Sequence, residues 1–227
     1  SGRAEFAMVN INKANNWFQT ASKQPTAFYG QLALAWLNLN EPNTLPPEPN
    51  LVAEEISEFQ KLELVKVIEI LSAINNHDAI KHFLLAIADI RKTTSWKLLT
   101  ARYAAKHGRI DVAITIAKKS SRSGEELIEA GYPIINLPLV KNNDSLTIET
   151  PLVLAMIRQE SVFYPRARSR ANARGLMQIL PRTAKKIAKN LKIKYSKRQL
   201  TNNPNYNMVI GQTYLRNLID EFDGSYV

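Results

Sequence analysis

The 227-residue sequence contains no cysteine. This absence excludes disulfide bonds, thiolate metal ligands and cysteine nucleophiles, but it leaves the cellular compartment open. Long hydrophobic runs are also missing, because no apolar stretch approaches the roughly 18–20 residues of a membrane-spanning helix. Glycine is scarce, with 8 residues, and alternation of Val, Ile and Thr is rare, which disfavours an all-β fold. We therefore expect a soluble, mainly helical protein.

The first residues read SGRAEFAM. They contain no basic region followed by an apolar segment and a small-residue cleavage site, as a secretory leader would. We interpret residues 1–8 as an expression scar, and the sequence itself does not indicate the cellular location.

The net charge of +10 is distributed unevenly. Residues 1–145 contain 16 Lys and Arg against 15 Asp and Glu, whereas residues 146–227 contain 14 against 5, so the balances are +1 and +9. Such an excess favours a polyanionic partner for the last third of the chain. Nucleic acid, an anionic membrane and the bacterial cell wall all qualify, and a basic but merely solvated surface is the alternative.

Apolar residues recur at helical spacing through the middle of the chain. This spacing predicts short antiparallel helices over residues 61–74, 82–90, 96–107 and 110–120, as in a helical bundle or a superhelical α-solenoid. Gly108 is expected just past a helix end. Trp17, Trp36 and Trp96 are interpreted as core aromatics.

Two segments interrupt the helices. Residues 38–50 contain four prolines and predict an exposed loop, and residues 131–144 combine two prolines with a polar run. Because the charge balance changes after the second break, we place a domain boundary there. The expected domains are a helical domain at residues 9–145 and a second domain at residues 146–227.

A helix is predicted directly after this boundary, with Thr150 as its cap and Pro151 in its first turn. Val153, Ile157 and Glu160 then fall on one face of that helix. We therefore expect Glu160 to be buried against apolar neighbours, which would keep its carboxyl partly protonated near neutral pH, as a general acid requires. A lone helical glutamate is ordinarily a surface residue or the partner of an arginine, so the residues that follow decide between these interpretations.

Those residues form a compound pattern. The Glu160-Ser161 pair is followed by Pro165, Ser169, Ala173, Gly175-Leu176-Met177-Gln178, Pro181 and Thr183-Ala184. This pattern resembles the soluble lytic murein transglycosylases, which have a goose-lysozyme-like catalytic domain. Similarity to the same family also covers residues 131–133, 203–207, 211–215 and 222–226, and more loosely residues 28–33. The resemblance implies a superhelical region followed by a lysozyme-like, mainly α domain with a small β element.

The resemblance also implies a mechanism. In this family one glutamate, here Glu160, protonates the β-1,4 glycosidic oxygen between N-acetylmuramic acid and N-acetylglucosamine and then acts as a base. The sugar's own 6-hydroxyl closes onto C1 and gives a 1,6-anhydro product. A second carboxylate about 5–10 Å away, which paired-carboxylate glycosidases need, is not evident in the sequence.

Further expectations follow from the resemblance. Ser169 and Gln178 would lie near Glu160 or the sugar, Gly175 and Met177 would shape the groove, and Ser161 would cap or orient. No metal or cofactor is implied, the substrate would be the glycan strands of peptidoglycan, and the location would be periplasmic. The arginines of residues 166–174 would either meet carboxylates of the substrate or be solvated.

The chain departs from the family pattern at three places. Asn172 stands where the family has glycine, so a positive φ is expected there, and Tyr164 replaces a small polar residue. The sequence stops at Val227, before the family's Ala-Tyr-Asn-Ala-Gly motif. The lysozyme-like domain is therefore expected to be incomplete, and this polypeptide to be weakly active or inactive.

Other functions remain open. One alternative is an inactive glycan-binding or scaffold protein of the cell wall, and another is a lysozyme-type hydrolase. A nucleic-acid-binding protein is disfavoured because the basic region lacks an RNA- or DNA-binding signature.

Overall fold

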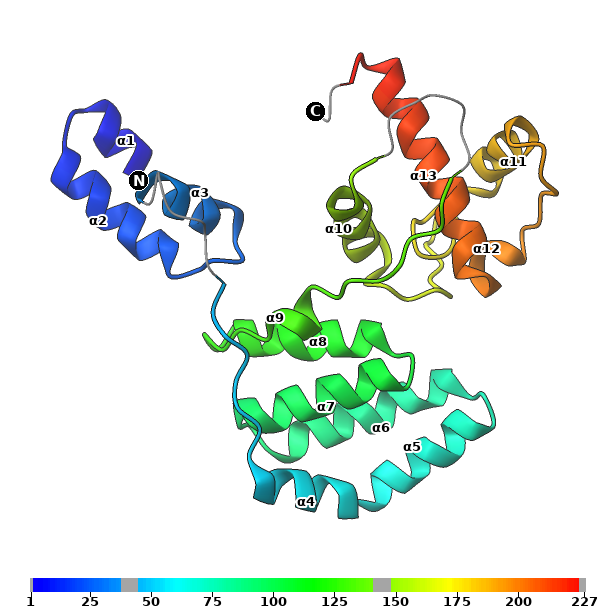
Figure 1. The fold of residues 1–227 in the computed structure, drawn as a ribbon, viewed down its shortest axis with the longest axis horizontal. Coiled ribbons are helices and arrows are strands. Elements are labelled where there is room, and N and C mark those ends of the chain that lie inside the picture. Colours follow the sequence, from blue (N-terminus) through cyan, green and yellow to red (C-terminus); the bar gives the residue numbers. More distant parts are fainter. Residues whose placement is uncertain (1, 38–44, 141–147, 225–227) are drawn as a thin grey trace. The chain divides into compact units, whose positions relative to one another are not determined.

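The structure is a computed structural model that describes residues 2–37, 45–140 and 148–224 (Figure 1). By compactness the chain divides into two units, residues 1–48 and residues 49–227. The predicted boundary between residues 145 and 146 lies outside the described residues, so the division into residues 9–145 and 146–227 stays a prediction. Residues 38–44 of the predicted proline-rich loop also lie outside them, while residues 45–50 are not helical, as predicted.

Over residues 2–37 and 45–48, the first unit forms three helices and has few large buried side chains. The expectation that Trp17 and Trp36 are core residues is wrong, because they are 53% and 43% exposed. A unit of this size has too little interior to enclose two indole rings. Trp36 instead lies in a half-exposed aromatic group, 4.6 Å from the ring of Phe6 and 5.3 Å from that of Phe18. Its helices are α1 (Gly2–Ala7), α2 (Ile11–Ser22) and α3 (Phe28–Leu37).

The second unit begins with a helical array, residues 53–131, in which successive helices pack against each other (Figure 1). Trp96 is fully buried in its core, as predicted, and its indole N–H donates to the carbonyl of Ile87 at 2.8 Å. Thr93 caps its helix by accepting from the Trp96 amide at 3.3 Å. Gly108 has φ +71° just after a helix end, as predicted. The helices are α4 (Ala53–Lys61), α5 (Glu63–Ala73), α6 (His77–Ile90), α7 (Thr94–Lys106), α8 (Ile110–Ser121) and α9 (Ile128–Gly131).

The C-terminal region, residues 150–224, contains α10 (Thr150–Ser161), α11 (Pro181–Asn190), α12 (Gln199–Asn202) and α13 (Pro204–Glu221). Asn203 caps α13 by accepting from the Tyr206 amide at 3.0 Å. The prediction that Thr150 caps α10 is wrong, because Thr150 is the first residue of this helix. Glu149 occupies the cap position, and its side chain makes no capping hydrogen bond. The segment between α10 and α11 is irregular and contains two isolated antiparallel bridges, which are the small β element.

A second apolar core holds α10 in place. Val153 and Ile157 of α10 are fully buried there together with Ile210 of α13. Ile114 of α8 belongs to the same core, so the helical array and the C-terminal region share buried contacts. This shared core fixes the N-terminal part of α10 and brings its last turn to the site described next.

Candidate active site

Glu160 lies in the last turn of α10, and its side chain is exposed. The expectation that it is buried with Val153 and Ile157 is therefore wrong. The face of α10 splits instead: Val153 and Ile157 enter the core, whereas Met156 and Glu160, one turn apart, line an open hollow. The core does not cover the side of the helix that carries Glu160, and so the carboxyl meets solvent-accessible space.

This hollow has a volume of about 220 Å³ and lies between α10, the start of α11 and one face of α13. Apolar side chains dominate its lining, with a few polar groups among them, as in many ligand sites. Glu160 is the only carboxylate that the described lining contains. The lining residues are Met156, Glu160, Met177, Gln178, Ile179, Leu180, Thr183, Gly211, Tyr214, Leu215 and Leu218.

The segment 175–178 forms a tight turn at the edge of the hollow. Gly175 has φ +75° and Gln178 has φ +47°. The Gln178 backbone amide and its side-chain amide both donate to the Gly175 carbonyl, at 3.2 and 2.8 Å. Met177 is 3% exposed. Three of the predicted groove residues, Gly175, Met177 and Gln178, thus lie together, and two of them line the same hollow as Glu160.

Asn207 of α13 holds this turn, a role that the sequence analysis does not assign. It is 1% exposed. Its Oδ1 accepts from the Met177 amide at 2.9 Å, and its Nδ2 donates to the carbonyls of Arg174 and Leu200 at 2.9 and 3.0 Å. One buried side-chain amide thereby satisfies three backbone groups of two separate segments.

Two glycines make this packing sterically feasible. A Cβ added at Gly175 would lie 2.0 Å from the Leu200 carbonyl oxygen and 2.3 Å from Asn207 Nδ2. A Cβ at Gly211 would lie 2.2 Å from the sulfur of Met177. Asn207, Gly211 and Tyr214 are spaced i, i+4 and i+7, so one face of α13 forms the floor beneath the turn and the hollow. That spacing is the signal by which the sequence could have identified them.

The two predicted serine positions lie elsewhere. Ser161 is 8% exposed, and its hydroxyl donates to the Ile157 carbonyl of its own helix at 3.1 Å. Ser169 is exposed and closes a turn by accepting from the Ala173 amide at 3.0 Å. Asn172, in the same turn, has φ +68°, as predicted for a position where the family has glycine. Neither serine lines the hollow in the described residues, and their substrate contacts stay predictions.

The C-terminal region has many exposed cationic side chains. Glu160 is the only acidic residue between Thr150 and Ile219, so the basic residues of this stretch have few neighbours of opposite charge. The exposed cations are Arg166, Arg168, Arg170, Arg182, Lys185, Lys186, Lys189, Lys192, Lys194, Lys197 and Arg198. Such a surface attracts an anionic polymer over distances up to the Debye length.

No group of three or more His, Cys, Asp or Glu side chains is placed to hold a metal ion within residues 2–37, 45–140 and 148–224. Over the same residues, every helix is too short or too polar to cross a bilayer. The expected absence of a metal stays a prediction.

Comparison with known proteins gives a match to a family model. Residues 139–227 match the family model described as Transglycosylase SLT domain. The matched residues include Glu160, the turn 175–178 and the face of α13 beneath it. The predicted resemblance to the lytic murein transglycosylases is thus confirmed.

Individual relatives extend the match towards the N-terminus. A Haemophilus influenzae protein, provisionally named a soluble lytic murein transglycosylase, is 29% identical over 210 residues, which are 91% of this chain and 34% of that protein. The soluble lytic murein transglycosylase of Escherichia coli is 32% identical over 131 residues, 56% of this chain and 20% of that protein. The chain therefore spans about a third or less of these relatives.

Solved structures confirm the fold. The 70 kDa soluble lytic transglycosylase of Escherichia coli superposes with a TM-score of 0.75 at 21% identity, covering 99% of this chain and 35% of that one. An inactive glutamate-to-glutamine mutant of the lytic transglycosylase Slt from Pseudomonas aeruginosa superposes with a TM-score of 0.76 at 21% identity, covering 98% and 36%. The predicted mainly α architecture, a helical array followed by a lysozyme-like region, is thus confirmed.

Proposed function

We propose that the chain acts as a peptidoglycan lytic transglycosylase. It cleaves the β-1,4 bond between N-acetylmuramic acid and N-acetylglucosamine and leaves a 1,6-anhydro-muramic end. The observation that carries this proposal is the position of Glu160, a single carboxylate in a largely apolar hollow beside the Gly175–Gln178 turn.

Each step needs only Glu160 and the substrate. The protonated carboxyl gives its proton to the glycosidic oxygen as the bond from C1 to that oxygen breaks. The resulting carboxylate then takes the proton of the muramic 6-hydroxyl, while that oxygen forms a bond to C1. The carboxyl ends protonated, as it began, and no water is consumed.

The scarcity of acidic residues supports this mechanism over a paired-carboxylate one. Hydrolases with two carboxylates place them about 5–10 Å apart around the scissile bond. Here the described lining of the hollow offers Glu160 alone. An internal nucleophile, the 6-hydroxyl, removes the need for a second carboxylate.

The remaining residues are given supporting roles in this proposal. Gln178 and Met177 form the wall of the groove against the sugar, and Gly175 permits the turn that presents them. Ser169 is assigned to the outer rim of the substrate path, and Ser161 to orienting the end of α10. The exposed cations attract the carboxylates of peptidoglycan. Because peptidoglycan lies outside the cytoplasm, the proposed location of the protein is the periplasm.

One relative adds support for a glutamate-dependent reaction. The Pseudomonas aeruginosa structure is that of an inactive protein in which a glutamate is replaced by glutamine. We expect the same replacement at Glu160 to have the same consequence in this chain.

The test is mass spectrometry of the products released from purified murein sacculi. The chain is compared with Glu160→Gln and with Glu149→Gln, a matched control at the opposite end of α10. We expect a low yield of anhydro-muropeptides from the chain and the control, and a further loss on the order of 10²- to 10⁴-fold in Glu160→Gln. Reducing-end products would instead identify a hydrolase. Sacculus binding without any products would favour the scaffold protein.

A further inference from the structure

The helical array contacts the chain on both sides of Glu160. Two residues before it, Arg158 Nε donates to the Gly131 carbonyl at 2.8 Å, and its guanidinium lies 4.3 Å from the centre of the Tyr132 ring. Four residues after it, the Tyr164 hydroxyl donates to Asp78 Oδ1 at 2.8 Å. Gly131 ends α9 and Asp78 lies in the first turn of α6, so both contacts come from the array.

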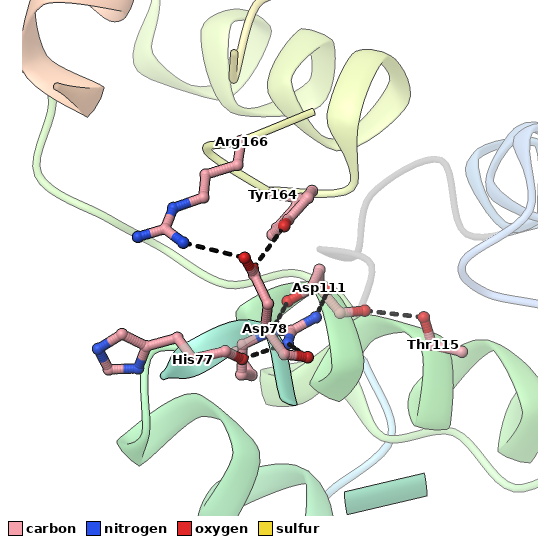
Figure 2. Close-up of polar contacts among 7 residues, drawn as sticks. His77, Asp78, Asp111, Thr115, Tyr164 and Arg166 are labelled. Carbon is pink, nitrogen blue, oxygen red and sulfur yellow. Dashed lines mark hydrogen bonds and ion pairs between the residues drawn. The ribbon is translucent and has the colours of Figure 1, made fainter. Parts of the chain in front are cut away.

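The second contact joins two side chains of the segment after α10 to one carboxylate. Figure 2 shows Tyr164 and Arg166 reaching from that segment to Asp78. Arg166 Nη1 lies 3.0 Å from Asp78 Oδ2, while Tyr164 occupies Oδ1. The hydrogen bond from Tyr164, with the charge of Arg166, lowers the pKa of Asp78. Asp78 therefore holds both side chains as an ionised acceptor.

The backbone next to Asp78 is held in place by a buried ion pair. Arg109 is 3% exposed and donates to both oxygens of Asp111, at 2.8 and 2.6 Å. A third bond, of 2.6 Å, reaches from Arg109 Nη1 to the His77 carbonyl, next to Asp78. The Arg109 guanidinium also lies 5.4 Å from the centre of the Tyr164 ring. One buried cation, Arg109, thus contacts both the first turn of α6 and the ring of Tyr164.

The backbone between Glu160 and Tyr164 needs such support. Val162 and Phe163 have φ values of +53° and +60°. A β-branched and an aromatic residue rarely adopt this left-handed conformation, which persists only where the surroundings enforce it. Phe163 is anchored in the second core at 4% exposure. The Tyr164–Asp78 bond fixes the following residue.

A continuous path of hydrogen bonds leads from Tyr164 to the hollow. The Ala167 amide donates to the Tyr164 carbonyl at 3.1 Å, and the Gly175 amide donates to the Ala167 carbonyl at 2.9 Å. The Gly175 carbonyl in turn accepts both bonds from Gln178. These bonds connect Tyr164 to the turn beside Glu160.

We propose that Asp78, a residue of the helical array, is a positioning residue for the Glu160 site, and that it acts through Tyr164. It fixes the segment after α10 and, through Ala167, the turn at Gly175. This inference deepens the proposed function, on which its kinetic consequence rests. The array is thereby part of the machinery that aligns the site.

The expected effect is on geometry more than on stability. The side chains of Arg166 and Asp78 are 52% and 55% exposed, and ion pairs at such sites add little to the free energy of unfolding. A misplacement of about 1 Å at an active site, in contrast, can lower the rate on the order of 100-fold. The two effects can be measured separately.

Amide hydrogen exchange tests the positioning without requiring activity. The variants are Asp78→Asn, Tyr164→Phe and their combination. Asp89→Asn is the matched control, since Asp89 lies on the same helix in an exposed pair with Lys119 at 3.7 Å. We expect exchange at the Ala167 and Gly175 amides to accelerate on the order of tenfold in each single variant, with no further gain in the combination. Unchanged exchange, or two additive effects, would overturn the proposal.

Turnover of murein supplies the second measurement. We expect kcat to fall on the order of tenfold in Asp78→Asn and Tyr164→Phe, with KM within about twofold, and both parameters to be unchanged in Asp89→Asn. A change in KM alone would contradict a positioning role. Absence of product from the unaltered chain would count against the proposed function alone, while the exchange experiment still decides whether Asp78 positions the segment.

Discussion

The helical array and the C-terminal region are both built from short helices, but they use charged side chains differently. In the array cations pair with acids, as in Lys97 with Glu125 at 2.8 Å and Arg102 with Glu129 at 2.9 Å. The C-terminal region has one acidic residue between Thr150 and Ile219, and a long series of exposed cations. Charged side chains of the array therefore pair with each other, whereas most of those in the C-terminal region are available to a partner.

Buried polar groups differ in a parallel way. The array encloses an ion pair, Arg109 with Asp111, at the start of α8. The C-terminal region encloses a neutral amide, Asn207, beneath the turn at Gly175. A neutral amide can hold the backbone beside Glu160 without placing a buried charge next to the acid. This difference suggests experiments in which one region serves as the control for the other.

The largest effect is expected from Gly175→Ala compared with Gly108→Ala. Both glycines have nearly the same φ, +75° and +71°, so both substitutions carry the left-handed penalty of about 1–2 kcal/mol. Only at Gly175 does the new Cβ collide with backbone, because nothing lies within 4 Å at Gly108. We expect Gly175→Ala to lower the free energy of unfolding by about 1–3 kcal/mol more than Gly108→Ala does. Urea unfolding monitored by circular dichroism measures both, and equal losses would refute the tight packing.

The next effect is expected from Asn207→Ala. The substitution leaves buried groups on Met177, Arg174 and Leu200 without their partner, which we expect to cost about 2–4 kcal/mol of unfolding free energy. The control in the array is Thr100→Ala, since the hydroxyl of Thr100 is fully buried but makes one bond, of 2.8 Å, to Trp96. A loss of about 1 kcal/mol is expected there. Similar losses of unfolding free energy in the two variants would argue against a contribution from all three hydrogen bonds of Asn207.

A moderate effect is expected from reversing exposed cations. Lys185→Glu with Lys189→Glu on α11 should weaken binding to sacculi about tenfold at low ionic strength, because the polymer is anionic. Lys66→Glu with Lys81→Glu, at exposed positions of the array, should leave binding nearly unchanged. The difference should disappear near 1 M salt, where the Debye length is about 3 Å. Co-sedimentation measures it, and equal weakening by both pairs would indicate a general effect of net charge.

The smallest effect concerns pH. The pKa of Asp78 lies below its ordinary value of 3.8, chiefly because Tyr164 donates to it. The unfolded chain therefore binds the proton more tightly, and the stabilisation by ionised Asp78 is present above pH 3.8 and is lost as the pH falls through the lower, folded pKa. The stability difference between the chain and Asp78→Asn, below about 1 kcal/mol for so exposed a pair, should shrink over that range. A difference that grows on acidification would contradict the assignment.

Sequence analysis predicts best what depends on neighbouring residues. The spacing over residues 110–120 predicts a helix that the structure places at Ile110–Ser121. The left-handed conformation at Gly108 follows from its place just past a helix end, and the one at Asn172 from the glycine that the resembling family has there. The groove residues Gly175, Met177 and Gln178 also come from that resemblance, and they lie together because they are close in the sequence.

Features that depend on distant partners are not predicted. Helical phase alone places Glu160 on a buried face, but whether that face is covered at the helix end depends on α11 and α13. Whether Trp17 and Trp36 are buried depends on the size of the unit around them rather than on their own hydrophobicity. No local pattern links Asp78 to Tyr164, and the role of Asn207 appears only when α13 lies against the turn.

The bond between Asp78 and Tyr164 also bears on the order of folding. Its partners are 86 residues apart, so the closure entropy of a long loop must be overcome before it forms. Adjacent helices such as α7 and α8 meet early, because their contacts are local. On the ribosome, where N-terminal segments fold first, the array would be complete before its partner segment emerges. The groove beside Glu160 would then assemble last, on a platform already in place.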